Sequence, residues 1–171
     1  MKIDEVGYWS ELKLEIIKKY AGAYSKILAA QKSSLEHHYI DAFAGAGIHL
    51  SRRTGEFILG SPLNALNIDP PFQHHHLIDL DGERVDYLRE ITKYEGDCNT
   101  VLLGKVFPKV RYEDYRRALC ILDPYRLNPD WKGCCEGRRN EIRGNIPEFY
   151  GNGHEHECAV EKSECCLGRA D

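Results

Sequence analysis

Four aspartates each stand at the end of an apolar run, where a side chain can reach a ligand. They are Asp41 in HHYID, Asp79 in HHLID, Asp97 in YEGD and Asp123 in ALCILD. Carboxylates accept hydrogen bonds and so suit sugar hydroxyls and amines. Each acid alone could instead cap a helix or begin a turn. Because intervals of 38, 18 and 26 residues place one acid after each successive run, we favour a shared binding edge.

The stretch that starts at the first aspartate, DAFAGAG, consists mainly of small residues. Gly45 and Gly47 lack a Cβ, so the backbone can turn tightly there and approach a ligand closely. These glycines could equally serve only a turn, since a lone glycine-rich loop is a weak sign. Asp79 ends the next run and is placed to hold the two hydroxyls of a ribose.

The elements that would position these residues are alternating strands and helices. Strands are expected before Asp41, Asp79 and Asp123, with a short one before Asp97, and helices are expected in GERVDYLREI and after Asn99. Another helix begins near Gly60, with Ser61 as its N-cap and Pro62 at its first position. This alternation predicts an α/β fold with a Rossmann-like parallel sheet that is flanked by helices and binds ligands beyond the carboxyl ends of its strands.

A long amphipathic helix is expected before the sheet. Apolar residues recur every three or four positions between Trp9 and Gln31. They predict that the buried face holds Trp9, Leu12, Ile16, Tyr20, Ala23 or Tyr24, and Ile27.

The composition is that of one globular domain, with 171 residues, of which 42% are hydrophobic and 29% charged. The net charge of -4 gives no sign of a large phosphate-binding face. No apolar run approaches the roughly 18 residues of a membrane span, and the start MKIDEVGYW lacks the pattern of a signal peptide. We therefore expect a cytoplasmic protein that does not associate with membranes.

The glycine loop and the series of acids resemble the class I S-adenosylmethionine-dependent methyltransferases. The resemblance implies S-adenosylmethionine as cofactor, a ribose contact from Asp79, an adenine-side contact from Asp97, and a cofactor loop that includes Asp41, Phe43, Gly45 and Gly47. The string LDPY resembles the fourth motif of methylases that act on amino groups of nucleic-acid bases, which implies catalytic roles for Asp123 and Tyr125. That motif usually carries a second proline or an asparagine, so Tyr125 could simply be a packing residue.

A more extensive resemblance is to the three-Cys-motif partner protein family. It rests on WSELKLEIIKKYAGAY, YIDAFAGAG, TGEFILGSPLNAL, LIDLD, GDCN, VRYEDYRRALCILDPY and LNPDW, and it extends from Tyr8 to about Lys132. It implies a methyltransferase-like fold and, as partner, an iron-sulfur protein of the radical-S-adenosylmethionine type encoded nearby. Two alternatives stay open: a non-catalytic docking partner of that neighbour, and an amino-group methylase acting on a nucleic-acid base.

The chain changes character after Lys132. Family members continue there with a helix and an apolar strand, which this chain lacks. Back-translation recovers such a continuation in a reading frame displaced by one base. The possible codons for Glu141 to Gly151 can encode KSVEIFLNFMV in that frame, and those from Asn152 onward can encode MDMNMNVLWKNP. We therefore expect residues 1–132 to be the N-terminal portion of a methyltransferase-like domain, with strands only up to about the fourth of the usual seven. Residues 133–171 are expected to be an out-of-frame, poorly ordered tail.

The tail is rich in residues that zinc prefers. Five of the seven cysteines lie in it, and Gly151 to Cys166 combines His154, His156, Cys158, Cys165 and Cys166. Their spacing, H-x-H-x-C followed by adjacent cysteines, does not match the paired spacing of structural zinc sites. We assign no metal site from the sequence and attribute these ligands to the frame change.

Overall fold

A four-stranded parallel sheet forms the centre of the protein. The structure is a computed structural model that describes residues 3–31, 34–81 and 92–123. The sheet contains β2 (Glu36–Asp41), β5 (His74–Asp79), β6 (Thr92–Glu95) and β7 (Arg116–Ile121), in the order β6-β5-β2-β7. The strands predicted before the four aspartates are therefore confirmed, and the short one, β6, has four residues.

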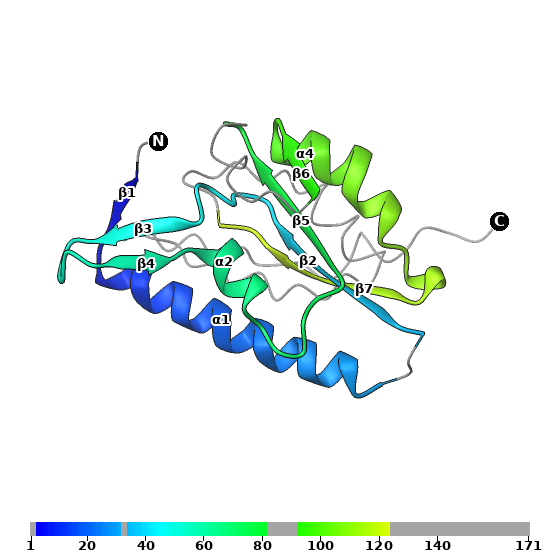
Figure 1. The fold of residues 1–171 in the computed structure, drawn as a ribbon. Helices are drawn as coiled ribbons and strands as arrows, with labels where there is room; N and C mark the ends of the chain where they lie inside the picture. The colour runs from blue at the N-terminus through cyan, green and yellow to red at the C-terminus, as the bar shows by residue number, and fades with distance from the viewer. Residues whose placement is uncertain (1–2, 32–33, 82–91, 124–171) are drawn as a thin grey trace, which may run out of the picture.

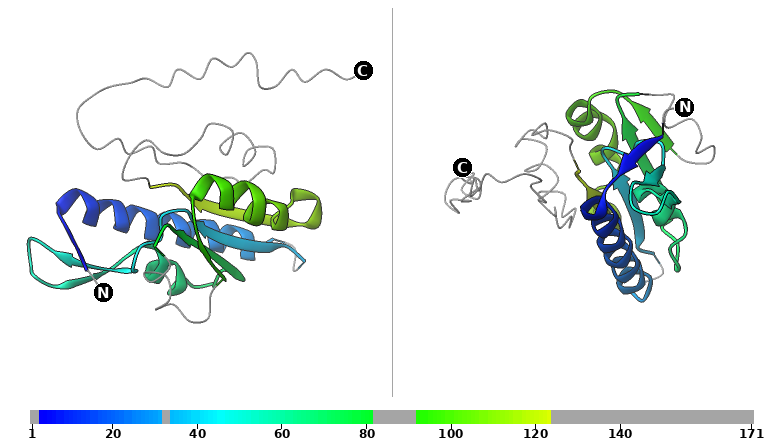
Figure 2. Two further views of the ribbon diagram at one scale, coloured as in Figure 1. Left: turned by 90° about the horizontal axis from the view of Figure 1, so that it is seen from above. Right: turned by 90° about the vertical axis from the view of Figure 1, so that its left-hand side faces the viewer.

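Helices cover both faces of this sheet (Figure 1). One face carries α1 (Tyr8–Ala29) and α2 (Ser61–Leu66), and the other carries α4 (Cys98–Val101), which continues into η1 (Leu102–Val106) and η2 (Phe107–Lys109) (Figure 2). Successive strand residues point to opposite faces, so Tyr39 packs in one core with Ile17, and Ile40 packs in the other with Val101. The turn η3 (Tyr112–Asp114) leads into β7. The protein has the predicted Rossmann-like α/β fold.

Helix α1 has nearly the predicted bounds but buries a different face. Its buried residues are Ile17, Ala21, Ser25 and Leu28. The predicted face points outward: Trp9 is 79% and Ile27 62% exposed, and Leu12, Ile16, Tyr20 and Ala23 are exposed too, with Tyr24 half-buried. The prediction was wrong because α1 carries two neighbouring stripes with the same spacing. Periodicity alone does not say which stripe meets the sheet.

A second, smaller sheet was not predicted. It consists of β1 (Asp4–Val6), β3 (Ile48–Ser51) and β4 (Phe57–Leu59), with β1 parallel and β4 antiparallel to β3. Gly55, at φ 71°, lies in the turn between β3 and β4, and its amide donates to the Ser51 carbonyl at 2.9 Å. Strands of three or four residues are too short to give a periodic signal.

Helix α2 has Gly60 as its N-cap, whereas Ser61 was predicted in that role. Pro62 lies in the first turn as expected. Ser61 makes no capping hydrogen bond, because its side chain instead hydrogen-bonds the Asp41 carboxyl group.

Within residues 3–31, 34–81 and 92–123, no helix combines the length and the apolar character needed to cross a membrane. The helix expected in residues 82–91 lies outside the described residues. So do the tail of residues 133–171 and the frame change proposed near Gly133.

Candidate functional site

The strand order places a switch point between β2 and β7. From β2 the sheet grows through β5 to β6 on one side, and the chain then returns to add β7 on the other side of β2. In such sheets, ligands bind beyond the carboxyl ends of the strands where the order reverses. Asp41 and Asp79 are the last residues of β2 and β5, and Asp123 follows the end of β7. The predicted acids therefore lie along one edge of the sheet.

The loop after β2 has the backbone geometry that its glycines permit. Gly45 and Gly47 have φ angles of 60° and 76°, a region that strains residues with a Cβ. The Gly60 amide donates to the Gly47 carbonyl at 2.6 Å, and a Cβ on Gly60 would come within 3.0 Å of that carbonyl group. Gly60 therefore lets the chain before α2 pack directly on the loop.

Asp79 is bonded to this loop. The Gly45 amide donates to Asp79 Oδ2 at 2.9 Å, and the Asp81 amide donates to Oδ1 at 2.9 Å. The Ala44 amide also donates to the Ile78 carbonyl at 3.0 Å. A carboxylate oxygen has two acceptor positions, and among the described residues each oxygen of the half-buried Asp79 has one donor, so one position on each is open to a ligand. The structure thus joins the predicted glycine loop to the predicted ribose-binding acid.

Asp97 is brought next to Asp79 through the backbone. The Gly96 amide donates to the Asp79 carbonyl at 3.0 Å. The Asp97 side chain caps α4, since its Oδ2 accepts from the Thr100 amide at 2.9 Å and from the Thr100 hydroxyl at 3.0 Å. Asp97 is exposed, and both hydrogen bonds of this cap are to Oδ2. The sequence left open that Asp97 caps a helix, and the structure confirms this role.

Asp41 is buried beneath the loop that follows β2 and bonds to the backbone of that loop. It is 1% exposed; its Oδ1 accepts from the Phe43 amide and its Oδ2 from the Tyr39 hydroxyl, both at 3.2 Å. Burial raises the pKa of the Asp41 carboxyl to about 6, and hydrogen bonds from Ser61 and Phe43 oppose this shift. The Phe43 ring packs on the core that α4 covers. Asp41 and Phe43 are therefore positioning residues for the loop.

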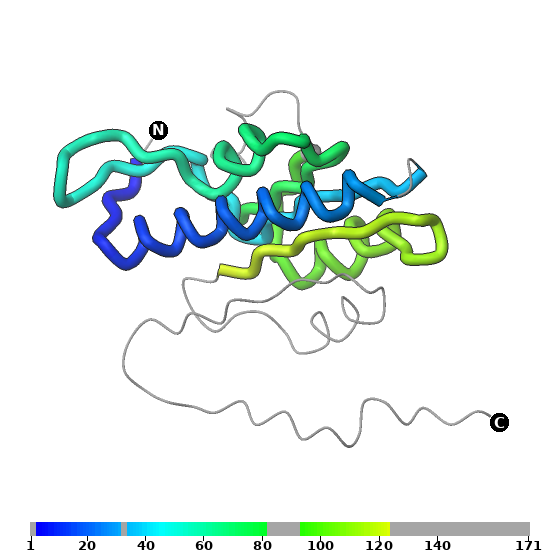
Figure 3. Tube along the Cα trace, turned by 90° about the horizontal axis from the view of Figure 1, so that it is seen from below, coloured from blue at the N-terminus to red at the C-terminus, as the bar shows by residue number. Residues whose placement is uncertain are grey.

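Asp123 is paired with a lysine that the sequence did not single out. Lys13 of α1 donates to Asp123 Oδ1 at 2.6 Å, and both side chains are partly exposed. Figure 3 shows why this pair forms, since α1 runs beside β7. No sequence pattern links Lys13 to Asp123, because 110 residues separate them. Tyr125 lies outside the described residues.

No family model matches this chain, and a search of curated proteins finds no match either.

Proposed function

We propose that this protein is a methyltransferase-like protein that binds S-adenosylmethionine, a three-Cys-motif partner protein acting with an iron-sulfur neighbour in the cytoplasm. The contact between Gly45 and Asp79 carries the proposal. It joins a loop with two glycines of positive φ to an acid on the adjacent strand, at the edge where the strand order reverses.

The residues at this edge suit such a cofactor. A Cβ placed on Gly45 would meet no atom of the described residues within 4 Å, so the loop borders open space. The remaining acceptor positions of Asp79 suit the two ribose hydroxyls, and Asp97 would lie on the adenine side. When bound, S-adenosylmethionine supplies an activated methyl group. Asp123 and Tyr125 would then face the methyl acceptor.

The proposal is tested by measuring S-adenosylmethionine binding calorimetrically, using protein from a gene in which the frame is restored after Lys132. Asp79→Ala removes charge-assisted hydrogen bonds worth roughly 1.5 to 3 kcal/mol, so we expect affinity to fall about ten- to a hundred-fold. Asp79→Asn, which keeps an acceptor for the Gly45 amide, separates lost charge from lost loop support.

Asp114→Ala is the matched control, because Asp114 lies in the turn before β7 and thus near the opposite end of that strand. It makes the same change of charge and should leave the affinity unaltered. No binding by the restored protein, or equal losses in the Asp79 and Asp114 variants, would refute the assignment.

A non-catalytic docking role is the second candidate, and the ion pair of Asp123 favours it. Lys13 donates to Asp123 Oδ1 at 2.6 Å, and its positive charge offsets that of the carboxylate, so Asp123 is a weaker hydrogen-bond acceptor for the amine that would receive the methyl group. Methyl transfer from labelled S-adenosylmethionine distinguishes the two candidates. Label in the neighbour protein or in nucleic acid supports catalysis, whereas cofactor binding without transfer supports docking.

A further inference from the structure

A cluster of histidines and one glutamate lies at the end of the sheet opposite the proposed cofactor edge. Glu36 and His38 are on β2, and His74 begins β5. His38 and His74 are directly paired in the register of the two strands. Given the rise of a strand, five residues from Glu36 to Asp41 put about 16 Å between the two ends. The cluster is therefore a separate feature from the loop of Gly45 and Gly47.

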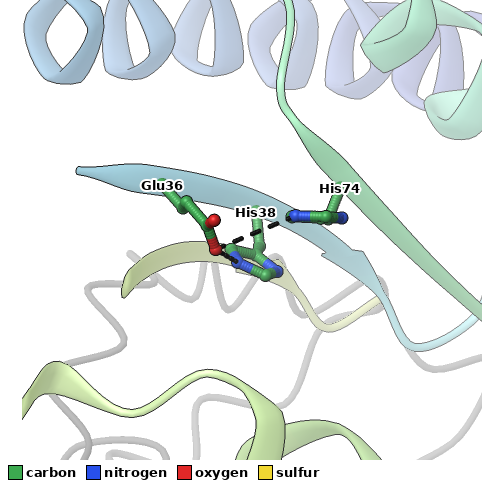
Figure 4. Close-up of side chains that lie close together, drawn as sticks. All are labelled: Glu36, His38 and His74. Carbon is green, nitrogen blue, oxygen red and sulfur yellow. Dashed lines mark ion pairs between the residues drawn. The ribbon is translucent and has the colours of Figure 1, made fainter. Parts of the chain in front are cut away.

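The three side chains turn toward one another (Figure 4). Glu36 Oε2 lies 3.8 Å from His38 Nε2 and 3.8 Å from His74 Nε2, and one potential ligand atom from each residue lies within 4.8 Å of the others. These separations exceed hydrogen-bond distance. Around a tetrahedral zinc ion, with bonds of about 2.0 to 2.2 Å, neighbouring ligand atoms are roughly 3.3 to 3.5 Å apart. Small side-chain movements would therefore bring all three to one ion.

His38 presents an unpartnered nitrogen to this cluster. Its side chain is 5% exposed, and Nε2 has no hydrogen-bond partner in the described part of the structure. Leaving a buried polar atom without a partner is costly, and a metal ion at this point would satisfy it. Glu36 and His74 are 44% and 50% exposed, so they have room to adjust and leave the site open to water on one side.

His38 is also held in the way that metal-bound histidines are. Its Nδ1 lies 3.0 Å from His76 Nε2, and His76 Nδ1 lies 3.3 Å from the Tyr94 hydroxyl. If a metal binds Nε2, the proton of the His38 ring is on Nδ1, and this N–H donates a hydrogen bond to His76 Nε2. Such a hydrogen bond from the second ring nitrogen fixes the orientation of a metal-bound imidazole.

One cation already borders the cluster. Arg116 donates through Nε to Glu36 Oε2 at 3.0 Å and also lies 3.6 Å from Asp114 Oδ2. It competes with a metal ion for the Glu36 carboxylate. A metal would have to share this carboxylate or displace Arg116 toward Asp114, so Arg116 should weaken metal binding.

We propose that Glu36, His38 and His74 form a binding site for a divalent transition metal ion, with zinc as the expected ion and water in its fourth position. Two imidazoles and one carboxylate, with one open position, form a ligand set that zinc accepts. The site is independent of S-adenosylmethionine and of the frame of the tail.

The proposal is tested by measuring zinc binding to the full chain by titration calorimetry. Because the tail carries its own cysteines and histidines, the titration is done in a variant with serine at all five tail cysteines and glutamine at His154 and His156. We expect one zinc ion per chain. Adding His74→Gln should weaken binding at least tenfold, and adding Arg116→Gln instead should strengthen it.

His75→Gln is the matched control, since the neighbouring strand residue points to the opposite face of the sheet. It should leave zinc affinity unchanged, with circular dichroism showing that each variant is folded. Cobalt(II) gives a second measurement, because the site has no thiolate and should produce visible ligand-field bands without a strong sulfur charge-transfer band. The proposal is overturned if the tail variant binds no zinc, or if His74→Gln and His75→Gln bind it equally.

Discussion

Asp41 shows how a residue predicted to contact cofactor serves the site indirectly. It was selected because it follows an apolar run and starts a glycine-rich stretch. The structure buries it under that loop, where it accepts hydrogen bonds from Tyr39, Phe43 and Ser61. Sequence could indicate the acid but not its burial, because burial depends on α2 bringing Ser61 next to β2. For the same reason, the position of Ser61 just before Pro62 predicts a helix cap, whereas its side chain bonds to Asp41.

The raised pKa of Asp41 predicts a specific pH dependence of stability. A carboxyl group whose pKa is about 6 in the folded state and 3.8 when unfolded stabilises the fold fully below pH 3.8. That contribution is lost as pH rises from about 4 to 6, because the folded state then holds more protons than the unfolded state. The shift corresponds to a loss on the order of 3 kcal/mol.

Asp41→Asn removes this titration while keeping an acceptor for the Phe43 amide. We expect the variant to gain stability relative to the original chain as pH rises from 4 to 6, and to show a constant difference above pH 7. Urea unfolding of both proteins at several pH values measures this difference directly, and other titrating groups cancel. A difference that does not change between pH 4 and 7 would show that Asp41 has an ordinary pKa.

Among the elements, the parallel strands were predictable and the orientation of α1 was not. In β2, β5 and β7 a short apolar run precedes an aspartate, whereas β6, with the sequence TKYE, was predicted from the alternation of strands and helices and from Asp97 after it. Helix α1 offers two stripes, and the one holding Ile17, Ala21 and Leu28 faces the sheet because Tyr39, Leu77 and Leu119 are on that face. The small sheet of β1, β3 and β4 was missed because its strands are too short to be periodic. The histidine cluster was missed because it depends on strand register, which pairs His38 with His74.

The orientation of α1 predicts opposite results for two isoleucines of one helix. Ile17 is 4% exposed and packs in the core, so Ile17→Ala should lower the free energy of unfolding by about 2 to 5 kcal/mol. Ile27 is 62% exposed, and Ile27→Ala should change it by no more than about 0.5 kcal/mol. Chemical denaturation of the two variants tests this, since both make the same substitution in the same helix. Equal losses would mean that both stripes are covered.

On the scale of the whole molecule, the two proposed binding sites lie at opposite ends of the strands of the main sheet. The carboxyl ends of β2 and β5 carry carboxylates and backbone amides, which suit a nucleoside cofactor, and the amino ends carry the imidazoles of the proposed metal site. The described residues contain the four strands expected up to Lys132. The predicted apolar continuation in the displaced frame would supply further strands, which is why the proposed function refers to a frame-restored protein.

The central claim is that S-adenosylmethionine binds at the carboxyl ends of these strands, and glycine amides report it most directly. In frame-restored protein labelled with ¹⁵N-glycine, we predict that saturating cofactor shifts the amide signals of Gly45, Gly47 and Gly96. Gly22 in α1 and Gly104 in η1 serve as internal controls and should move little. Unchanged signals from Gly45 and Gly47 at saturation, or equal shifts at Gly22 and Gly104, would contradict the claim.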